Sequence, residues 1–130
     1  MYNVYRSVFL NTFPFGTGIT SSEAIAVCIP VIVYPEQTSV LHFSLAQIRV
    51  ISNEQGDLEQ LLSVHSIDEY VRRAVEIASM SAYESRVLRE TLCKRRTQLF
   101  GIDRADEAAR EWAAFIYKVS AAFRSGGEEE

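Results

Sequence analysis

The chain has 130 residues, of which 48% are hydrophobic and 23% are charged. Its length suits one domain that buries roughly two thirds of the surface exposed by the unfolded chain, and its composition excludes a disordered or fibrous protein. Three acidic residues at the C-terminus account for most of the formal net charge of −4. The rest of the chain is close to neutral, so the sequence predicts no nucleic acid partner.

The two cysteines, Cys28 and Cys93, are far apart in the sequence and stand in apolar or helical surroundings. We predict that both are reduced thiols, as is typical of cytoplasmic or nuclear proteins. No apolar run has the length of a membrane span, and the N-terminus lacks the pattern of a secretory signal. The sequence therefore predicts a cytoplasmic or nuclear protein without membrane contact. Because the chain opens almost directly in a strand, we also expect it to be a fragment of a longer protein.

The first third of the chain has the pattern of a strand, a helix and a second strand. Residues 4–10 are apolar enough for a strand buried on both faces of a parallel sheet. After a loop at 11–19, a short helix covers about 21–27 and ends before Pro30, because the residue preceding a proline avoids helical backbone. A second strand covers 31–34. This order predicts parallel strands joined by a right-handed crossover.

The rest of the chain is predicted to be mainly helical. A polar loop at 36–41 precedes a short helix at 43–48 and a small β-like segment at 49–52. Sequences typical of capping boxes at Ser66–Glu69 and Ser81–Glu84 predict the starts of two later helices. All helices expected after residue 52 cover about 57–64, 67–78, 82–99 and 104–123. Spacings of three and four define an apolar stripe on the 67–78 helix at Ile67, Tyr70, Val71, Ala74, Val75 and Ala78.

The last helix has its own apolar stripe and is expected to pack across a neighbouring surface. That stripe consists of Ala105, Ala108, Ala109, Trp112, Ile116, Val119 and Phe123. The fold prediction is α/β, with a Rossmann-like parallel sheet and a helical C-terminal part in one domain over 1–124. A disordered acidic tail follows at 125–130.

The stretch from Gly16 to Glu23 has the composition of an anion-binding turn. Glycines let the backbone approach a ligand, and the first N–H groups of a helix have no partner within it. The positive end of the helix dipole favours a phosphate, to which nearby hydroxyl groups can donate, while Glu23 could accept from a sugar diol. Thr20–Glu23 also fits a capping box that involves no ligand, so two interpretations are open.

Other chemistry-bearing residues give weaker signals. His42 and His65 are the only histidines, too few and too isolated for a metal site or a catalytic triad. We expect the basic residues of the 82–99 helix to form a solvated face, and the alternative is a face that binds a phosphate or an acidic partner. These residues are Arg86, Arg89, Lys94, Arg95 and Arg96. No nucleophile or metal ligand is assigned.

Residues 10–24, LNTFPFGTGITSSEA, and residues 29–35, IPVIVYP, resemble the C-terminal part of the catalytic region of O-linked N-acetylglucosamine transferases, including their SPINDLY-like relatives. The resemblance implies the C-terminal half of a GT-B glycosyltransferase. In that family this loop and helix start bind the diphosphate of a UDP-sugar without a metal or other cofactor. The resemblance therefore implies that Gly18, Ile19, Thr20 and Ser21 contact the diphosphate and that Glu23 binds the ribose.

The implied function is to bind the UDP-sugar donor, such as UDP-N-acetylglucosamine, for transfer of the sugar to Ser or Thr hydroxyls of a protein acceptor. In the resembling enzymes the acceptor and general-base groups come largely from the N-terminal GT-B half, on the same or a separate chain here. We therefore assign no catalytic residue and expect little activity from this chain alone. The alternatives are a non-catalytic, truncated or diverged Rossmann-like interaction module and a phosphosugar-binding domain of unrelated activity.

Overall fold

The computed structural model describes residues 7–35, 42–101 and 105–125. The chain divides into two compact units, Met1–Leu99 and Phe100–Glu130, and each is described by itself. Four predicted segments lie wholly or partly outside the described residues: the start of the first strand, the loop at 36–41, the first residue of the last helix and the acidic tail. For those segments the sequence-based expectations stay predictions.

The predicted parallel pairing of the first two strands is confirmed. β1 (Phe9–Leu10) pairs in parallel with β2 (Val31–Ile32), so that Phe9 faces Val31 and Leu10 faces Ile32. A parallel bridge between Val33 and Ser63 continues the sheet toward a third segment. The larger Rossmann-like sheet that we expected is not found, because the described residues form only these two short strands within a mainly helical fold.

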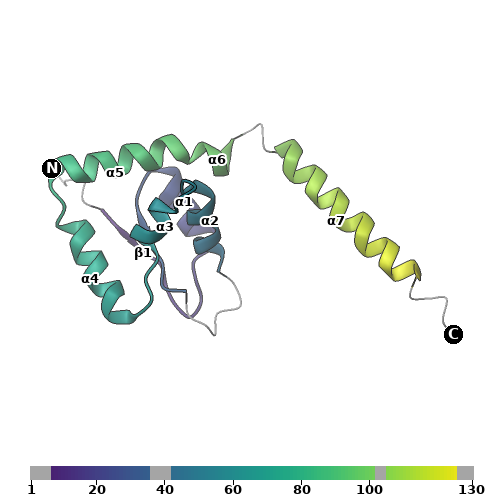
Figure 1. Cartoon of the computed structure of the whole chain (residues 1–130), viewed down its shortest axis with the longest axis horizontal. Helices are drawn as coiled ribbons and strands as arrows, with labels where there is room; N and C mark the ends of the chain where they lie inside the picture. Colours follow the sequence, from purple (N-terminus) through teal and green to yellow (C-terminus); the bar gives the residue numbers. More distant parts are fainter. Residues whose placement is uncertain (1–6, 36–41, 102–104, 126–130) are drawn as a thin grey trace. The chain divides into compact units, whose positions relative to one another are not determined.

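Helices make up most of the described chain (Figure 1). They are α1 (Ile19–Ala26), α2 (Phe43–Ile51), α3 (Asp57–Leu62), α4 (Ile67–Ala78), α5 (Ala82–Arg95), α6 (Thr97–Phe100) and α7 (Ala105–Ser125). The β-like segment predicted at 49–52 is wrong, because α2 continues to Ile51. Ile48 and Ile51 are fully buried three residues apart, so helical burial decides the conformation over the β propensity of these branched residues.

The core of the first unit lies where β2 meets the surrounding helices. Its most deeply buried apolar side chains are Ile25, Val31, Ile32, Ile48, Ile51, Leu62, Val64 and Leu92. Burial of each such side chain contributes roughly 1.5–3 kcal/mol. The stripe predicted on α4 is only partly confirmed, because Tyr70 is buried whereas Ile67, Val71 and Val75 are more than half exposed.

The two capping boxes predicted for α4 and α5 have different outcomes. At α5 the box is complete: Ser81 Oγ accepts the Glu84 N–H at 3.2 Å, and Glu84 Oε2 accepts the Ser81 N–H at 2.9 Å. At α4, Ser66 accepts the Glu69 N–H at 3.1 Å, but the carboxylate of Glu69 accepts from the His65 N–H at 2.8 Å. Only half of the predicted box is therefore present at Ser66.

The prediction that both cysteines are reduced is wrong, because Cys28 and Cys93 form a disulfide bond. The bond joins the residue just beyond the end of α1 to α5, across a separation of 65 residues. Cys28 has a left-handed backbone with φ of 62°, a conformation that usually belongs to glycine. Its N–H donates to the Ile25 carbonyl at 2.9 Å and the next N–H donates to the Ala24 carbonyl at 2.8 Å, which caps α1.

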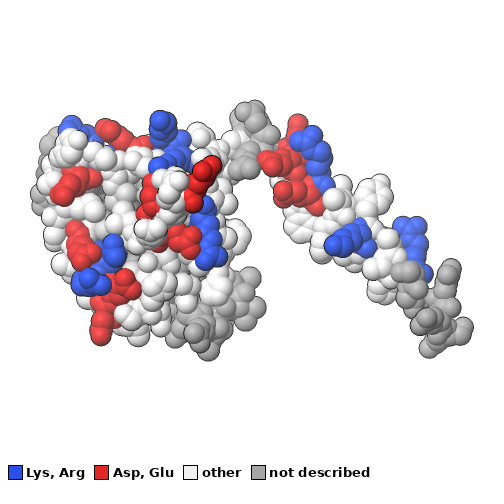
Figure 2. Space-filling view, in the orientation of Figure 1, with Lys and Arg blue, Asp and Glu red and all other residues white. Residues whose placement is uncertain are grey.

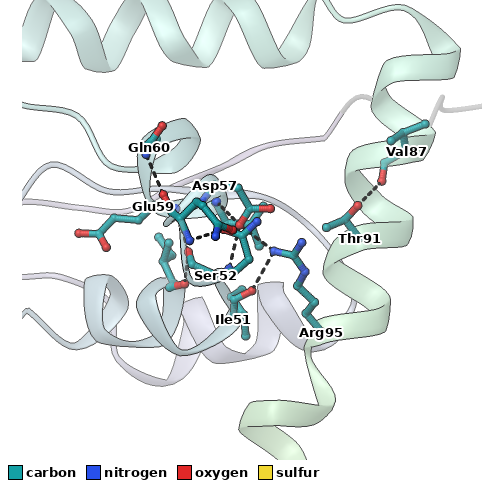
Figure 3. A network of polar contacts seen from close by, with 12 residues as sticks. Ile51, Ser52, Asp57, Glu59, Gln60, Val87, Thr91 and Arg95 are labelled. Atoms are coloured by element: carbon teal, nitrogen blue, oxygen red, sulfur yellow. Dashed lines mark hydrogen bonds and ion pairs between the residues drawn. The ribbon is translucent and has the colours of Figure 1, made fainter.

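The expectation of a solvated basic face is wrong in part, because three of the predicted arginines bind other parts of the first unit. Arg89 donates to the Val27 carbonyl at 3.3 Å. Arg96 donates to the Ala26 carbonyl at the end of α1, where the helix dipole favours a positive charge. Arg95 donates to Asp57 at 2.7 Å and to the Ile51 carbonyl at 3.4 Å, as Figure 3 shows. The Arg95 contacts join α5 to α2 and α3.

Charged side chains of both signs are interspersed over the face of the first unit seen in Figure 2. Neither sign forms a continuous area on that face. Among the residues that the structure describes, no helix is both long enough and apolar enough to cross a bilayer.

Candidate functional site

The candidate site lies at the start of α1, which follows β1 through a loop at residues 11–18. In sheets with parallel strands, ligands bind beyond the carboxyl ends of the strands, and this loop leaves the carboxyl end of β1. The first four N–H groups of a helix have no acceptor within it. In α1 the first helical bond is a long one, from the Ser22 N–H to the Gly18 carbonyl at 3.4 Å. No acceptor is found in the described chain for the N–H groups of Ile19, Thr20 and Ser21.

The ligand-free interpretation of this turn as a capping box is wrong. Gly18, not Thr20, occupies the N-cap position, and no side chain caps the helix. Thr20 is the second helical residue, and both Thr20 and Glu23 are exposed. Because they are separated by three positions, the two side chains lie on the same side of the helix. The structure therefore leaves the first amides of α1 uncapped by side chains.

Ser21 is oriented differently from what a diphosphate contact through its hydroxyl would require. Its side chain is fully buried, with 0% exposed. The hydroxyl lies within hydrogen-bond distance of the Gly18 carbonyl oxygen at 2.9 Å and of the Ser44 hydroxyl in α2 at 2.9 Å. Ser21 can therefore offer a ligand its backbone N–H but not its hydroxyl.

Gln47 of α2 binds two consecutive serine side chains of α1. Its Nε2 donates to Ser22 Oγ at 2.5 Å, and its Oε1 accepts from the Ser21 hydroxyl at 3.1 Å. The hydroxyls of these serines therefore face α2 and fix the direction in which α1 begins. Thr20 is left as the hydroxyl residue exposed on the first turn.

Asn11 connects β1 to this turn and was not among the site residues found from the sequence. It is 4% exposed, and its Oδ1 accepts from the Thr17 N–H at 2.9 Å and lies 3.2 Å from the Ser44 hydroxyl. The sequence signal that could have identified Asn11 as a site residue was its position directly after an apolar strand. A Cβ added at Gly16 would lie 3.1 Å from Asn11 Nδ2, so glycine lets the loop fold closely over this side chain.

Tyr70 of α4 fixes the same strand end from a distant part of the sequence. Its hydroxyl donates to the Asn11 carbonyl at 2.8 Å. Burial raises the pKa of Tyr70, which keeps the hydroxyl protonated and able to donate. The Phe13 ring packs edge-on against the rings of Tyr70 and Tyr34, with centroids 5.5 and 5.2 Å apart. The loop before α1 is therefore held from both α2 and α4.

A small cavity lies beside the loop. Its lining includes Asn11, Thr12, Gly16, His42 and Ser44. None of the five site residues found from the sequence, Gly18 to Ser21 and Glu23, lines this cavity. Those five are instead at the outer surface of the helix start or, for Ser21, beneath it. The helix start is thus an open surface next to the cavity.

The arrangement can attract an anion through backbone dipoles. No group of His, Cys, Asp or Glu side chains suited to a metal ion is found in the part of the chain that the structure describes. The described residues of the first unit form a mainly helical fold with a small two-stranded parallel sheet, and the first helix has no side-chain cap. Comparison with models of protein families, with curated proteins and with solved structures found no match for this chain.

Proposed function

We propose that this chain binds a nucleotide sugar at the start of α1, as the donor-binding part of a GT-B protein O-glycosyltransferase. The observation that carries the proposal is the set of three amides at Ile19, Thr20 and Ser21, which have no acceptor among the described residues and follow the end of a parallel strand. The likeness of residues 10–24 to O-linked N-acetylglucosamine transferases supports the same chemistry. The donor is UDP-N-acetylglucosamine or a related nucleotide sugar.

In this proposal the diphosphate lies against the first turn of α1. Ile19 and Ser21 donate through their backbone N–H groups, and Thr20 adds its exposed hydroxyl. A Cβ at Gly18 would meet only Phe43, at 3.8 Å, so the space above this residue is open. Glu23, one turn farther along the exposed side, accepts hydrogen bonds from the ribose.

The catalytic contribution of these groups is electrostatic. Negative charge grows on the departing diphosphate during sugar transfer, and the partial positive charge at the helix start stabilises it. This stabilisation requires no metal ion. An N-terminal GT-B half, on the same or a separate chain, supplies the base and the surface that binds the protein acceptor. We therefore expect little transfer to Ser or Thr hydroxyls from this chain alone.

The cytoplasm or nucleus remains the proposed location, and the Cys28–Cys93 bond weighs against it. Cytosolic reductants keep most protein thiols reduced. Mass spectrometry of the chain from its native source, after thiols are blocked at the moment of lysis, shows whether the two cysteines are reduced or bonded in the cell. Blocked thiols on both cysteines support the location, whereas an unmodified, bonded pair contradicts it.

Calorimetric titration of the purified chain with UDP, and separately with UDP-N-acetylglucosamine, tests the proposed function. Thr20→Ala and Glu23→Ala each remove a group expected to contact the ligand. A hydrogen bond to a charged group contributes about 1.5–3 kcal/mol, so each change is expected to weaken binding about tenfold or more. Glu90→Ala is the matched control, because Glu90 is also an exposed helical glutamate but lies in α5.

Binding that Thr20→Ala and Glu23→Ala weaken and Glu90→Ala preserves supports the donor site. Absence of UDP binding to the wild-type chain overturns it. Helical circular dichroism of each variant separates loss of binding from loss of fold. A high transferase rate from the isolated chain would contradict the assignment of the remaining catalytic groups to another half.

A second candidate function is a non-catalytic interaction module. One observation favours it: the hydroxyls of Ser21 and Ser22 are already engaged within the domain, which reduces the donors available to a phosphate. Failure to bind UDP, together with binding to another protein chain, would select this candidate.

A further inference from the structure

Helix α7, considered by itself, presents a wide exposed apolar face. Trp112 is 65% exposed, Phe115 58% and Phe123 87%. Apolar residues alternate at spacings of four and three along the helix, at Ala105, Ala109, Trp112, Ile116, Val119 and Phe123. This alternation is the spacing by which one helix packs along another. The face therefore has the pattern of a helix that pairs with a second helix.

The charges of α7 are distributed unequally along its length. Glu107 and Arg110 accompany Asp106 and Glu111 in the first half, so three of its four charged side chains are acidic. The two charged side chains of the second half, Lys118 and Arg124, are both basic. Figure 2 shows acidic side chains near the beginning of α7, with a basic one beside them, and only basic charged side chains farther along.

One acidic and one basic residue form a matched pair along the edge of the apolar face next to Phe115. With 3.6 residues per turn, Glu111 and Lys118 lie two turns apart on that edge. The midpoint of this pair is next to Phe115. This edge of α7 is therefore acidic on one side of Phe115 and basic on the other.

We propose that α7 pairs with α7 of a second copy of this chain, antiparallel and centred near Phe115. A two-fold axis at that point brings each edge of the helix against the same edge of the second copy in reverse. Glu111 then faces Lys118 of the second copy. A parallel pair in register would instead place the two acidic halves side by side, which like charges oppose.

The available apolar surface is sufficient for such a pair. An aromatic side chain can bury roughly 150–250 Å². Trp112, Phe115 and Phe123 of two helices, six rings in all, therefore carry roughly 900–1,500 Å². Stable protein interfaces bury about 1,200–2,000 Å² in total. The polar side of α7 has as many acidic as basic residues, which favours a second copy of the helix over an anionic lipid surface.

Sedimentation equilibrium of the full chain over a range of concentrations tests the pairing. We expect a reversible dimer in the wild-type chain and at least tenfold weaker association in Trp112→Ala. Tyr117→Ala is the matched control, because Tyr117 is an aromatic residue of the same helix that is 74% exposed on the side opposite Trp112 and Phe115. Association unchanged by Trp112→Ala would overturn the proposal, and so would a wild-type chain that stays monomeric at every concentration.

A charge exchange tests the antiparallel orientation. Glu111→Lys and Lys118→Glu should each weaken the dimer on the order of tenfold at low salt, because each creates two like-charged pairs. The double variant restores both pairs with reversed signs and should recover wild-type association. Arg110→Glu, a change of equal charge on the opposite side of the helix, is the control. Failure of the double variant to recover association overturns the antiparallel arrangement.

Two further results are decisive. The chain could be monomeric while its α7 variants lose binding to a separately produced N-terminal GT-B half. That result identifies the N-terminal half as the occupant of the apolar face and overturns the second-copy proposal. If the chain is monomeric and its α7 variants lose binding to anionic phosphatidylserine vesicles, a lipid surface is the occupant and the second-copy proposal is overturned. UDP titration is read out independently of association, so this proposal and the donor site can each fail alone.

Discussion

The Cys28–Cys93 bond gives the sharpest prediction about the stability of the first unit. It ties the far end of α1, the helix at whose start the candidate site lies, to α5. Opening the bond with a reductant, or removing it with Cys93→Ser, releases a closed loop of 65 residues in the unfolded chain. The loop-entropy relation for a loop of that length corresponds to about 4 kcal/mol of stability at 25 °C.

A second contribution comes from the backbone at Cys28. Its φ of 62° lies in the left-handed region, where a residue with a Cβ is about 1–2 kcal/mol less favourable than glycine. Cys28→Gly also removes the bond but relieves this cost. We therefore expect Cys28→Gly to be more stable than Cys28→Ser by about 1 kcal/mol, although both lack the cross-link.

Urea unfolding followed by circular dichroism measures these differences. Without reductant, the wild-type chain should exceed Cys93→Ser by about 4 kcal/mol in free energy of unfolding. With reductant, the two should be equal to within the error of the extrapolation. Identical unfolding of the wild-type chain with and without reductant would refute the cross-link, and equal stability of Cys28→Gly and Cys28→Ser would refute the role assigned to the backbone.

Two other predictions concern groups that join distant elements. Tyr70→Phe leaves the buried carbonyl of Asn11 without its donor and should lower the free energy of unfolding by about 1–3 kcal/mol. The control, Tyr83→Phe on the exposed surface of α5, should leave the free energy of unfolding unchanged. Equal effects of the two changes in urea unfolding would contradict the role of the Tyr70 hydroxyl. The hydrogen bond from Arg95 lowers the pKa of Asp57 from 3.8 to about 2, so the stability it contributes is present above about pH 4 and is lost as the pH falls toward 2. Acid unfolding between pH 4 and 2 should therefore be less steep in the Asp57→Asn variant, and superimposable curves for the two proteins would exclude this contribution.

Local patterns in the sequence were sufficient to predict most helical segments and the first strand pair. The Ser81–Glu84 box and the apolar spacing of α7 depend only on residues within a few turns of each other, and both helices are present. The end of α5 was predicted wrongly, because this helix ends at Arg95 and not near residue 99. Parallel pairing of β1 with β2 followed from the order of strand, helix and strand. The periodicity of α4 predicted a helix but not its buried side, because burial depends on which neighbours cover it.

At the turn before α1, too, some features follow from the local sequence and others only from the tertiary structure. The sequence by itself determined that glycines and hydroxyl residues precede a helix after a strand, since these are properties of neighbouring residues. Only the tertiary structure decided that α1 begins at Ile19, that the Ser21 hydroxyl points inward, and that Asn11 is held by Ser44 and Tyr70, 33 and 59 residues away. The disulfide bond between residues 65 positions apart was likewise decided only by the tertiary structure. The physical reason is that a hydrogen bond or disulfide requires atoms to meet within a few ångströms, and the path of the whole chain decides which distant residues do so.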